Sequence, residues 1–250
     1  MKTVVDGLAV EYVDEGHGPV ILFLHGWKDN LHTFDALVPY LSNAFRVIRL
    51  DLPGFGESEA PTQAWHVIDY ARFVSLFLGK IQVKPVAFVG HSLGGRIVMK
   101  GISHGVFSSD RIVLIASAGV ARRKTLRNAL FYAAAKAGKL FTSVPPFSLA
   151  RKRMRALLYR RAGSDYLDAG VLRETFLNII REDLSTEAKS ISVPTLMIWG
   201  GRDTETPLSE GMRLARLIPH AALEVVIEGS HFVHQESPER VAQLMRTFLQ

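Results

Sequence analysis

Hydrophobic residues recur along the chain in short runs that alternate with longer segments of helical spacing. Six short runs predict buried strands, at residues 20–24, 46–50, 86–89, 111–115, 194–199 and 223–227. An unbroken apolar run such as residues 20–24 is typical of a strand that is covered on both faces. Ahead of these runs, residues 4–5 and 8–13 predict an opening hairpin whose turn is Asp6-Gly7.

Helical spacing fills the segments between the predicted strands. Residues 31–41, 67–78 and 208–217 predict helices, and a further helix is expected to begin at Leu93. A last helix is expected at Pro238, with the side chain of Ser237 as its N-cap. Strands that alternate with helices predict an α/β fold: a mostly parallel central sheet with helices on both faces.

The alternation stops from residue 119 to about residue 190. Three helical segments are predicted there, at residues 121–141, 146–162 and 166–184. We therefore expect two parts: a core made of residues 1–118 and 191–250, and a helical insertion of residues 119–190.

The insertion differs from the rest of the chain in charge. Residues 119–163 hold twelve Lys or Arg and no Asp or Glu, whereas the rest of the chain holds 18 basic and 24 acidic residues. Such asymmetry is compatible with a solvated outer face, with an acidic partner, or with an anionic membrane surface. Nucleic acid is not expected as a partner, because no recognisable binding module accompanies the charge.

Composition excludes several classes of protein. The chain of 250 residues contains no cysteine, so it has no disulfide, thiolate metal site or cysteine nucleophile. It has no run of 18 apolar residues, and its first residues lack the apolar core of a signal peptide. We therefore expect a cytoplasmic protein. No paired histidines at ligand spacing accompany a carboxylate, so neither a metal nor a cofactor is expected.

One pentapeptide, Gly90-His91-Ser92-Leu93-Gly94, fits the pattern G-x-S-x-G between a predicted strand and a predicted helix. In that context the serine occupies a sharp, strained turn that lifts its hydroxyl above the sheet edge. The flanking glycines leave room for the turn, and the helix directs its free N–H groups at the same spot. The alternative is a glycine-rich connection with a solvated serine.

Polar or glycine-rich loops follow five of the predicted strands. Carboxyl ends of parallel strands meet at one edge of a sheet, where active sites of open α/β folds lie. Three of these loops supply Ser92, Asp203 and His231, in the chain order of the α/β-hydrolase triad. In such a triad the histidine takes the proton of the serine, and the carboxylate fixes the imidazole.

Other residues compete for two of these roles. Glu205 and Asp51 are alternatives to Asp203 as the acid, and His234 is the alternative to His231 as the base. His25 and His91 adjoin functional backbone, where we expect them to pack or to form hydrogen bonds.

These motifs resemble those of the α/β-hydrolase superfamily, within it the capped serine esterases and carbon–carbon-bond hydrolases. The resemblance covers nearly the whole chain and rests on His25-Gly26-Trp27, residues 51–56, 90–94 and 201–203, Ser230-His231, and residues 235–238. It implies Ser92 as nucleophile, His231 as base, Asp203 as acid, and an oxyanion hole formed by the backbone N–H groups of Trp27 and Leu93. The position of Ser230 is often glycine in relatives.

The resemblance also implies a role for the insertion, as a helical cap over the active site. Its apolar residues would then wall an acyl pocket, so the substrate-binding residues expected are Trp27, Leu93, Phe131 and Leu157. We expect a cofactor-free serine carboxylesterase that acts on small to medium acyl esters through an acyl-enzyme. Two alternatives stay open: a carbon–carbon-bond hydrolase of diketone-like substrates, and a non-catalytic ligand receptor. For the basic insertion, a related methyl esterase of biotin precursor synthesis suggests docking of an acidic acyl carrier protein.

Overall fold

The computed structural model describes residues 1–117, 119–120 and 172–250. Eight strands form one sheet in the order β1-β2-β4-β3-β5-β6-β7-β8. The first two strands pair antiparallel, as do β2 and β4, and every other pairing is parallel. The strands are β1 (Lys2–Val5), β2 (Leu8–Glu15), β3 (Val20–Leu24), β4 (Arg46–Leu50), β5 (Ala87–His91), β6 (Arg111–Ile115), β7 (Thr195–Gly200) and β8 (Ala221–Val226).

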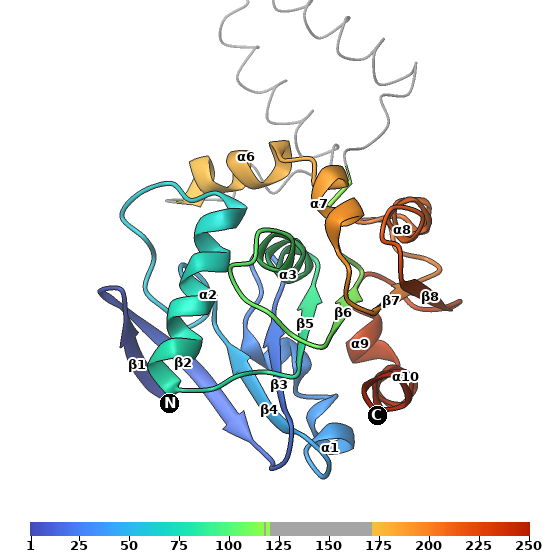
Figure 1. Cartoon of the computed structure of the whole chain (residues 1–250), viewed down its shortest axis with the longest axis horizontal. Coiled ribbons are helices and arrows are strands. Elements are labelled where there is room, and N and C mark those ends of the chain that lie inside the picture. Colours follow the sequence, from blue (N-terminus) through green and yellow to red (C-terminus); the bar gives the residue numbers. More distant parts are fainter. Residues whose placement is uncertain (118, 121–171) are drawn as a thin grey trace, which may run out of the picture. The chain divides into compact units, whose positions relative to one another are not determined.

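Helices cover both faces of this sheet (Figure 1). On one face α2 packs against α3, and α3 packs on β5, β3 and β6; on the other, α1 packs against α10. Helix α8 packs on β7 and β8. Within the described residues, the helices are η1 (Leu31–Phe34, a 3₁₀ turn), α1 (Val38–Leu41), α2 (Val67–Ile81), α3 (Leu93–Ser103), α6 (Arg173–Arg181), α7 (Ser185–Ser190), α8 (Leu208–Ala215), α9 (Val233–Glu236) and α10 (Pro238–Leu249).

Alternate residues of the parallel strands supply the core on the face of α1 and α10. Phe23, Val89 and Ile198 are fully or almost fully buried there, together with Leu41 of α1 and Met245 of α10. Residues in between point to the opposite face, because side chains alternate along a strand. Both faces of the central strands are thus apolar, which explains their unbroken hydrophobic runs.

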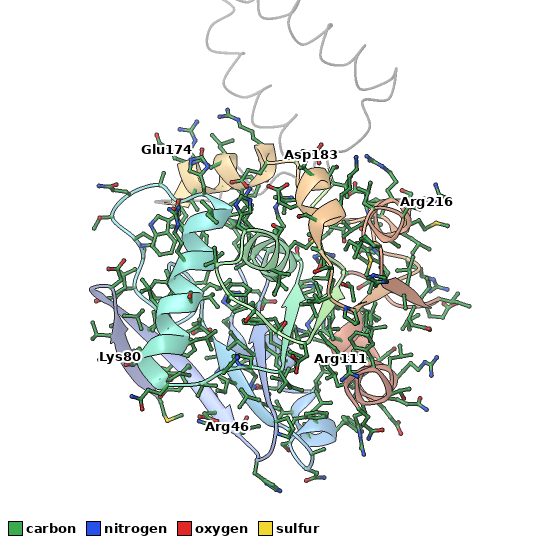
Figure 2. All side chains as sticks on the ribbon, in the orientation of Figure 1. Arg46, Lys80, Arg111, Glu174, Asp183 and Arg216 are labelled. Atoms are coloured by element: carbon green, nitrogen blue, oxygen red, sulfur yellow. The ribbon has the colours of Figure 1, made fainter. Side chains whose placement is uncertain are left out.

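The amino ends of the strands are held by short polar contacts. Arg46, at the start of β4, donates from Nε and Nη2 to the carboxylate of Asp14 at 2.8 and 2.6 Å. Arg111, at the start of β6, donates to the carbonyl of Leu249 at 3.0 Å; both arginines are labelled in Figure 2. The hydroxyl of Thr195, at the start of β7, donates to the carbonyl of Val193 at 3.0 Å. These contacts join β4 to β2, β6 to the end of α10, and the start of β7 to the residues just before it.

Most of the predicted elements are confirmed, but the helix predicted over residues 31–41 is wrong. The structure has a 3₁₀ turn at Leu31–Phe34 and a separate short helix at Val38–Leu41. Pro39 explains the interruption, because its ring nitrogen carries no proton and its ring would clash with the carbonyl of residue 35 in a continuous helix. Proline is instead accommodated in the first turn of the new helix, where Pro39 lies.

Two further predictions about helix ends need correction. Ser237 does precede Pro238 at the start of α10, but its side chain forms no capping hydrogen bond. Its ψ of 55° departs from the extended conformation of a capping residue, because Ser237 also ends α9 by donating its N–H to Val233. The helix predicted to reach residue 184 ends at Arg181, and a separate helix, α7, follows.

The chain divides into two compact units, Met1–Ala121 with Asn178–Gln250, and Arg122–Leu177. The predicted helices over residues 121–141 and 146–162 lie outside the described residues, so they stay predictions. Among the helices that the structure describes, none combines the length and hydropathy needed to cross a bilayer.

Candidate active site

The register of the parallel strands aligns their carboxyl ends. Leu24 of β3 pairs with Gly90 of β5, and Ile115 of β6 pairs with Ile198 of β7. The loops that follow these strands therefore start along one edge of the sheet. This edge carries the side chains or backbone that the sequence predicts for the site, namely Trp27, Ser92, Asp203 and His231.

Ser92 occupies the sharp turn between β5 and α3. Its φ of 49° and ψ of −109° are rare for a residue with a side chain. The flanking glycines are required by space: a Cβ on Gly90 would lie 2.4 Å from the nitrogen of Gly95, and one on Gly94 would lie 1.9 Å from the carbonyl oxygen of Leu24. The turn thus has the geometry of the predicted nucleophile elbow.

Helix α3 begins directly after the serine. The N–H groups of Gly95 and Arg96 donate to the carbonyl of Ser92 at 3.1 and 3.3 Å. The N–H of Leu93 precedes these bonds, so it belongs to the unsatisfied donors at the helix start, where the dipole is positive. This is a suitable place for one of the two predicted oxyanion donors.

The loop after β3 lies against this turn. A Cβ on Gly26 would stand 3.3 Å from the Cβ of Ser92 and 3.1 Å from Nδ1 of His91. The second predicted oxyanion donor, the N–H of Trp27, belongs to the next peptide unit. The assignment of Trp27 and Leu93 as oxyanion donors remains a prediction.

His25 fixes the orientation of that peptide unit. Its Nε2 accepts the N–H of Leu52 at 2.9 Å, so its Nδ1 carries the proton and donates to the carbonyl of Gly26 at 2.7 Å. Burial lowers the pKa of His25, which keeps the ring neutral as this pattern requires. Because a trans peptide is planar, the N–H of Trp27 points away from the carbonyl that His25 holds. His25 thus forms hydrogen bonds beside functional backbone, as expected.

Asp203 and His231 form a buried pair. Nδ1 of His231 and Oδ2 of Asp203 are 2.9 Å apart. The other carboxylate oxygen accepts the N–H groups of Glu205 and Thr206 at 2.9 and 2.8 Å, and the Thr206 hydroxyl donates to Oδ2 at 2.8 Å. The carboxylate is therefore held on every side, and its remaining direction is toward the imidazole.

The same contacts set the charge of Asp203. Burial acts to raise the pKa of this carboxyl group, but the hydrogen bond and charge of His231 and the donors of Thr206 outweigh it. The net effect is a pKa below the usual value, so Asp203 is ionised at neutral pH. An ionised, fixed carboxylate on Nδ1 leaves Nε2 of His231 for chemistry.

The competing acids occupy other positions. Asp51 accepts the N–H groups of Leu31 and Glu57 at 2.6 and 2.8 Å, and it therefore holds its own loop. Glu205 approaches the opposite nitrogen of the imidazole, with Oε2 at 3.6 Å from Nε2 of His231, and its side chain is 60% exposed. Only Asp203 has the geometry of an orienting acid.

The competing base, His234, is fully buried and lies away from Asp203. Its Nε2 is 3.0 Å from the hydroxyl of Thr33, and the side-chain amide of Gln235 donates to that hydroxyl at 2.7 Å. Burial, followed by the charge of His231, lowers the pKa of His234 to about 3. A histidine with this pKa is a poor base at neutral pH.

The loop that carries His231 is anchored at Ser230, the preceding residue, by the carboxylate of Glu236. Glu236 accepts the N–H and the hydroxyl of Ser230 at 2.6 and 2.5 Å, a pairing that a glycine at position 230 could form only in part.

Among the described residues, no hydrogen bond joins Oγ of Ser92 to Nε2 of His231. Catalytic hydrogen bonds are often long or poorly aligned in proteins without bound substrate.

The predicted pocket residues are only partly described. The ring of Trp27 packs edge-on against Phe55, with centroids 4.9 Å apart, and Leu93 is almost fully buried. Phe131 and Leu157 lie outside the described residues. Their role in substrate binding remains a prediction.

Sequence reasoning missed Thr206 and Glu236. The hydroxyl of Thr206 also lies 3.2 Å from Nδ1 of His231, so it contacts both members of the pair. Thr206 follows an aspartate by three residues in a glycine-rich turn. This spacing could have identified Thr206, because an aspartate side chain commonly bonds to the backbone a few residues ahead. Glu236 lay within a motif but had no assigned partner.

Comparison with known proteins finds similar hydrolases. A protein from Bacillus subtilis described as an uncharacterised hydrolase is 27% identical over 98% of this chain and 96% of its own length. A monoacylglycerol lipase of Mus musculus is 26% identical over 94% of this chain and 76% of its own length.

Solved structures share the fold of this chain. A bacterial membrane phospholipase A superposes with a TM-score of 0.78 at 25% identity, over 100% of this chain and 84% of that chain. The model of the alpha/beta hydrolase family matches residues 21–244, which is most of the chain. The chain therefore belongs to the alpha/beta hydrolase family.

Proposed function

We propose that this protein is a serine hydrolase that cleaves carboxylic esters of small to medium acyl chains through an acyl-enzyme on Ser92. The observation that carries the proposal is the buried 2.9 Å hydrogen bond between Asp203 and His231 at the sheet edge where Ser92 is held in a strained turn. In this arrangement the imidazole can act as the base that activates the serine hydroxyl, and the carboxylate orients the imidazole.

Acylation begins with the attack of Oγ of Ser92 on the ester carbonyl carbon. Nε2 of His231 takes the hydroxyl proton, and Asp203 stabilises the imidazolium that forms. The negative oxygen of the tetrahedral intermediate is bound by the N–H groups of Trp27 and Leu93, and one such donor commonly contributes about 3 kcal/mol of barrier lowering. The intermediate collapses when His231 gives its proton to the leaving alcohol.

Deacylation repeats the sequence with water as nucleophile. His231 takes a proton from the water as its oxygen attacks the acyl carbon, and the same donors bind the oxyanion. Collapse returns the proton to Oγ of Ser92 and releases the carboxylic acid. No cofactor or metal enters either half of this cycle.

Two similar proteins support an ester as the substrate. The monoacylglycerol lipase and the membrane phospholipase A bear names of enzymes that cleave carboxylic esters. At 25 to 26% identity they support the bond type but leave the acyl group and the leaving group to experiment.

The test is a panel of p-nitrophenyl esters of rising chain length, with a vinylogous diketone alongside. We expect hydrolysis that is fastest for short or medium acyl groups and absent in S92A. The matched control is Ser75→Ala, which removes a hydroxyl that donates to the carbonyl of Val106 at 3.1 Å on α2, far along the chain from the site. Faster cleavage of the diketone than of every ester would overturn the proposal in favour of carbon–carbon bond hydrolysis.

A fluorophosphonate probe separates the enzyme from a receptor that shares the fold. We expect the probe to label Ser92, and labelling to disappear in S92A and to fall strongly in H231A. An unlabelled wild-type protein that still binds a small ligand would be a receptor.

For the basic insertion, we keep docking of an acidic carrier protein or attachment to an anionic membrane as proposals. The triple substitution R151E, K152E and R155E is expected to slow turnover of carrier-bound acyl groups, or to release the protein from anionic vesicles, while small esters are cleaved at the wild-type rate. Equal responses of small and carrier-bound substrates, with no vesicle binding by the wild type, would leave the solvated outer face as the explanation.

A further inference from the structure

His91 is the residue immediately before the proposed nucleophile, and the mechanism above gives it no role. It is 1% exposed at the carboxyl end of β5. Its Nε2 lies 3.1 Å from the main-chain carbonyl oxygen of His231, 140 residues further along the chain. The centroids of the two imidazole rings are 4.8 Å apart. His91 thus joins the turn that holds the serine directly to the loop that holds the base.

The direction of this hydrogen bond fixes the tautomer of His91. A carbonyl oxygen only accepts, so Nε2 of His91 must carry the proton. Nδ1 is then the bare nitrogen; among the described residues it forms no hydrogen bond, and the nearest carboxylate oxygen, Oδ2 of Asp29, is 4.0 Å away. A neutral ring with its proton on Nε2 satisfies the contact with His231.

The surroundings keep the ring neutral. Burial lowers the pKa of His91 well below its usual value, and the charges of His234, His231 and His25 act in the same direction. The ring of His234 packs on it with centroids 4.4 Å apart. His91 can therefore stand beside an imidazolium at position 231 without adding a second positive charge during the reaction.

We propose that His91 is a positioning residue for the reaction, which sets the separation between the Ser92 hydroxyl and the His231 imidazole by holding the main chain of His231. Asp203 fixes the ring of His231 through Nδ1, but it does not fix the backbone from which the ring extends. His91 supplies that second anchor, and it does so from the residue covalently bonded to Ser92. The inference rests on the proposed function, because it assigns His91 to the same site.

Packing alone would not require this arrangement. A buried apolar side chain of similar size would fill the same space between β5 and the loop after β8 without a donor. A buried imidazole is costly unless its nitrogen finds a partner, and the partner here is the one carbonyl that belongs to the proposed base. The donor, rather than the volume of the side chain, is therefore the feature to test.

Three substitutions separate the donor from the volume. H91Q places an amide N–H near the position of Nε2, H91N carries the same group on a side chain too short to reach, and H91L fills space without a donor. We expect kcat for a p-nitrophenyl ester to fall about 10- to 100-fold in H91N and H91L, the scale of a small misplacement of reacting groups. H91Q should stay within about threefold of wild type, and KM should change little in all three.

Stability is measured on the same proteins, with T195V as the control. T195V removes a partly buried side-chain bond to a carbonyl, at the opposite edge of the sheet, and should lower the free energy of unfolding without lowering kcat. A merely structural role of His91 would make activity follow stability across all four variants. Loss of activity in H91Q equal to that in H91L would overturn the proposal.

Histidine ¹⁵N NMR gives a readout that needs no activity. The proposal expects His91 as the neutral tautomer with its proton on Nε2, unchanged between pH 5 and 8, and it is overturned if the proton lies on Nδ1. A wild-type protein that shows this tautomer but cleaves no ester and takes no probe would refute the proposed function and leave the contact standing. A wild-type protein that is labelled no faster than H91N and H91L would refute only the role of His91.

Discussion

Polar groups form different kinds of contact at the two edges of the parallel sheet. At the amino edge, Arg46 pairs with Asp14 on the neighbouring strand, and Thr195 bonds to a carbonyl two residues away. At the carboxyl edge, Ser92 has a strained backbone, and the histidines at positions 25, 91, 231 and 234 are all at most 5% exposed.

This contrast separates stability from function. Each contact at the amino edge holds the start of one strand, through a partner two to 138 positions away in the sequence. Contacts at the carboxyl edge join loops that lie far apart in the sequence, and several of them cost free energy, because a buried polar group or a positive φ is unfavourable by itself. We therefore expect substitutions at the carboxyl edge to remove activity and those at the amino edge to reduce stability.

The largest expected effect is that of S92A. Ester hydrolysis should fall by at least about 10⁴-fold, because the nucleophile of the proposed mechanism is lost. The free energy of unfolding should change by less than about 1 kcal/mol, since alanine keeps the Cβ and the backbone is held by its neighbours. Initial rates and urea unfolding provide the two measurements. A large loss of stability in S92A would contradict the separation of the two edges.

The next effect is that of D203N, which replaces the acid by a neutral group of the same shape. We expect kcat to fall about 10³- to 10⁴-fold, because the amide no longer selects the imidazole tautomer. The fold lowers the pKa of Asp203, so the stability that its charge contributes is present above the unfolded value of about 4 and is lost as pH falls through the lower folded value. The stability gap between wild type and D203N should therefore narrow below about pH 4. A difference in stability that widens below about pH 4 would contradict the lowered pKa of Asp203.

A smaller effect is expected from H234F. The pKa of His234 in the folded protein is about 3, whereas a histidine in the unfolded chain titrates near 6.5. Between these values only the unfolded chain takes up the proton, so His234 lowers the stability of the wild type by about 1.4 kcal/mol for each pH unit as the pH falls. H234F should show a shallower decline from pH 6.5 to 4.5. The same slope in both proteins would mean that the buried ring is protonated.

The smallest effect is that of T195V at the amino edge. One partly buried hydrogen bond is lost with little change of volume, so the free energy of unfolding should fall by about 1 kcal/mol at every pH. Activity should remain within twofold of wild type. Thermal unfolding and ester hydrolysis measured together would expose any coupling between the two edges; a tenfold loss of kcat would show that the amino edge also positions the site.

Local sequence patterns predicted much of the fold because they record local constraints. The apolar runs gave the strands β3, β4 and β6 with their observed bounds, since a strand buried on both faces leaves no polar position. The helix predicted over residues 31–41 failed because the effect of Pro39 on the preceding turn was not weighed. The cap predicted at Ser237 failed because two helices share that residue.

The candidate site divides in the same way. Gly90, Ser92 and Gly94 were identifiable because the turn demands those residue types within five positions. In the sequence, Asp203 was preferred over Glu205 because a glycine turn directly precedes it, and His231 over His234 because it lies in the strand-end loop; distances in space now distinguish them. The sequence held no local signal for the contact of His91 with the main chain of His231, because every residue type carries a backbone carbonyl.

By itself the sequence determined the alternation of strands and helices, the turn at Ser92 and the order of the three proposed triad residues, because each follows from spacing along the chain. Only the tertiary structure decided which nitrogen of His231 faces Asp203, which histidines stay neutral and which carbonyl His91 holds. Those features depend on distances between residues 28 to 140 positions apart and on exclusion of water, and both arise only when the sheet is assembled.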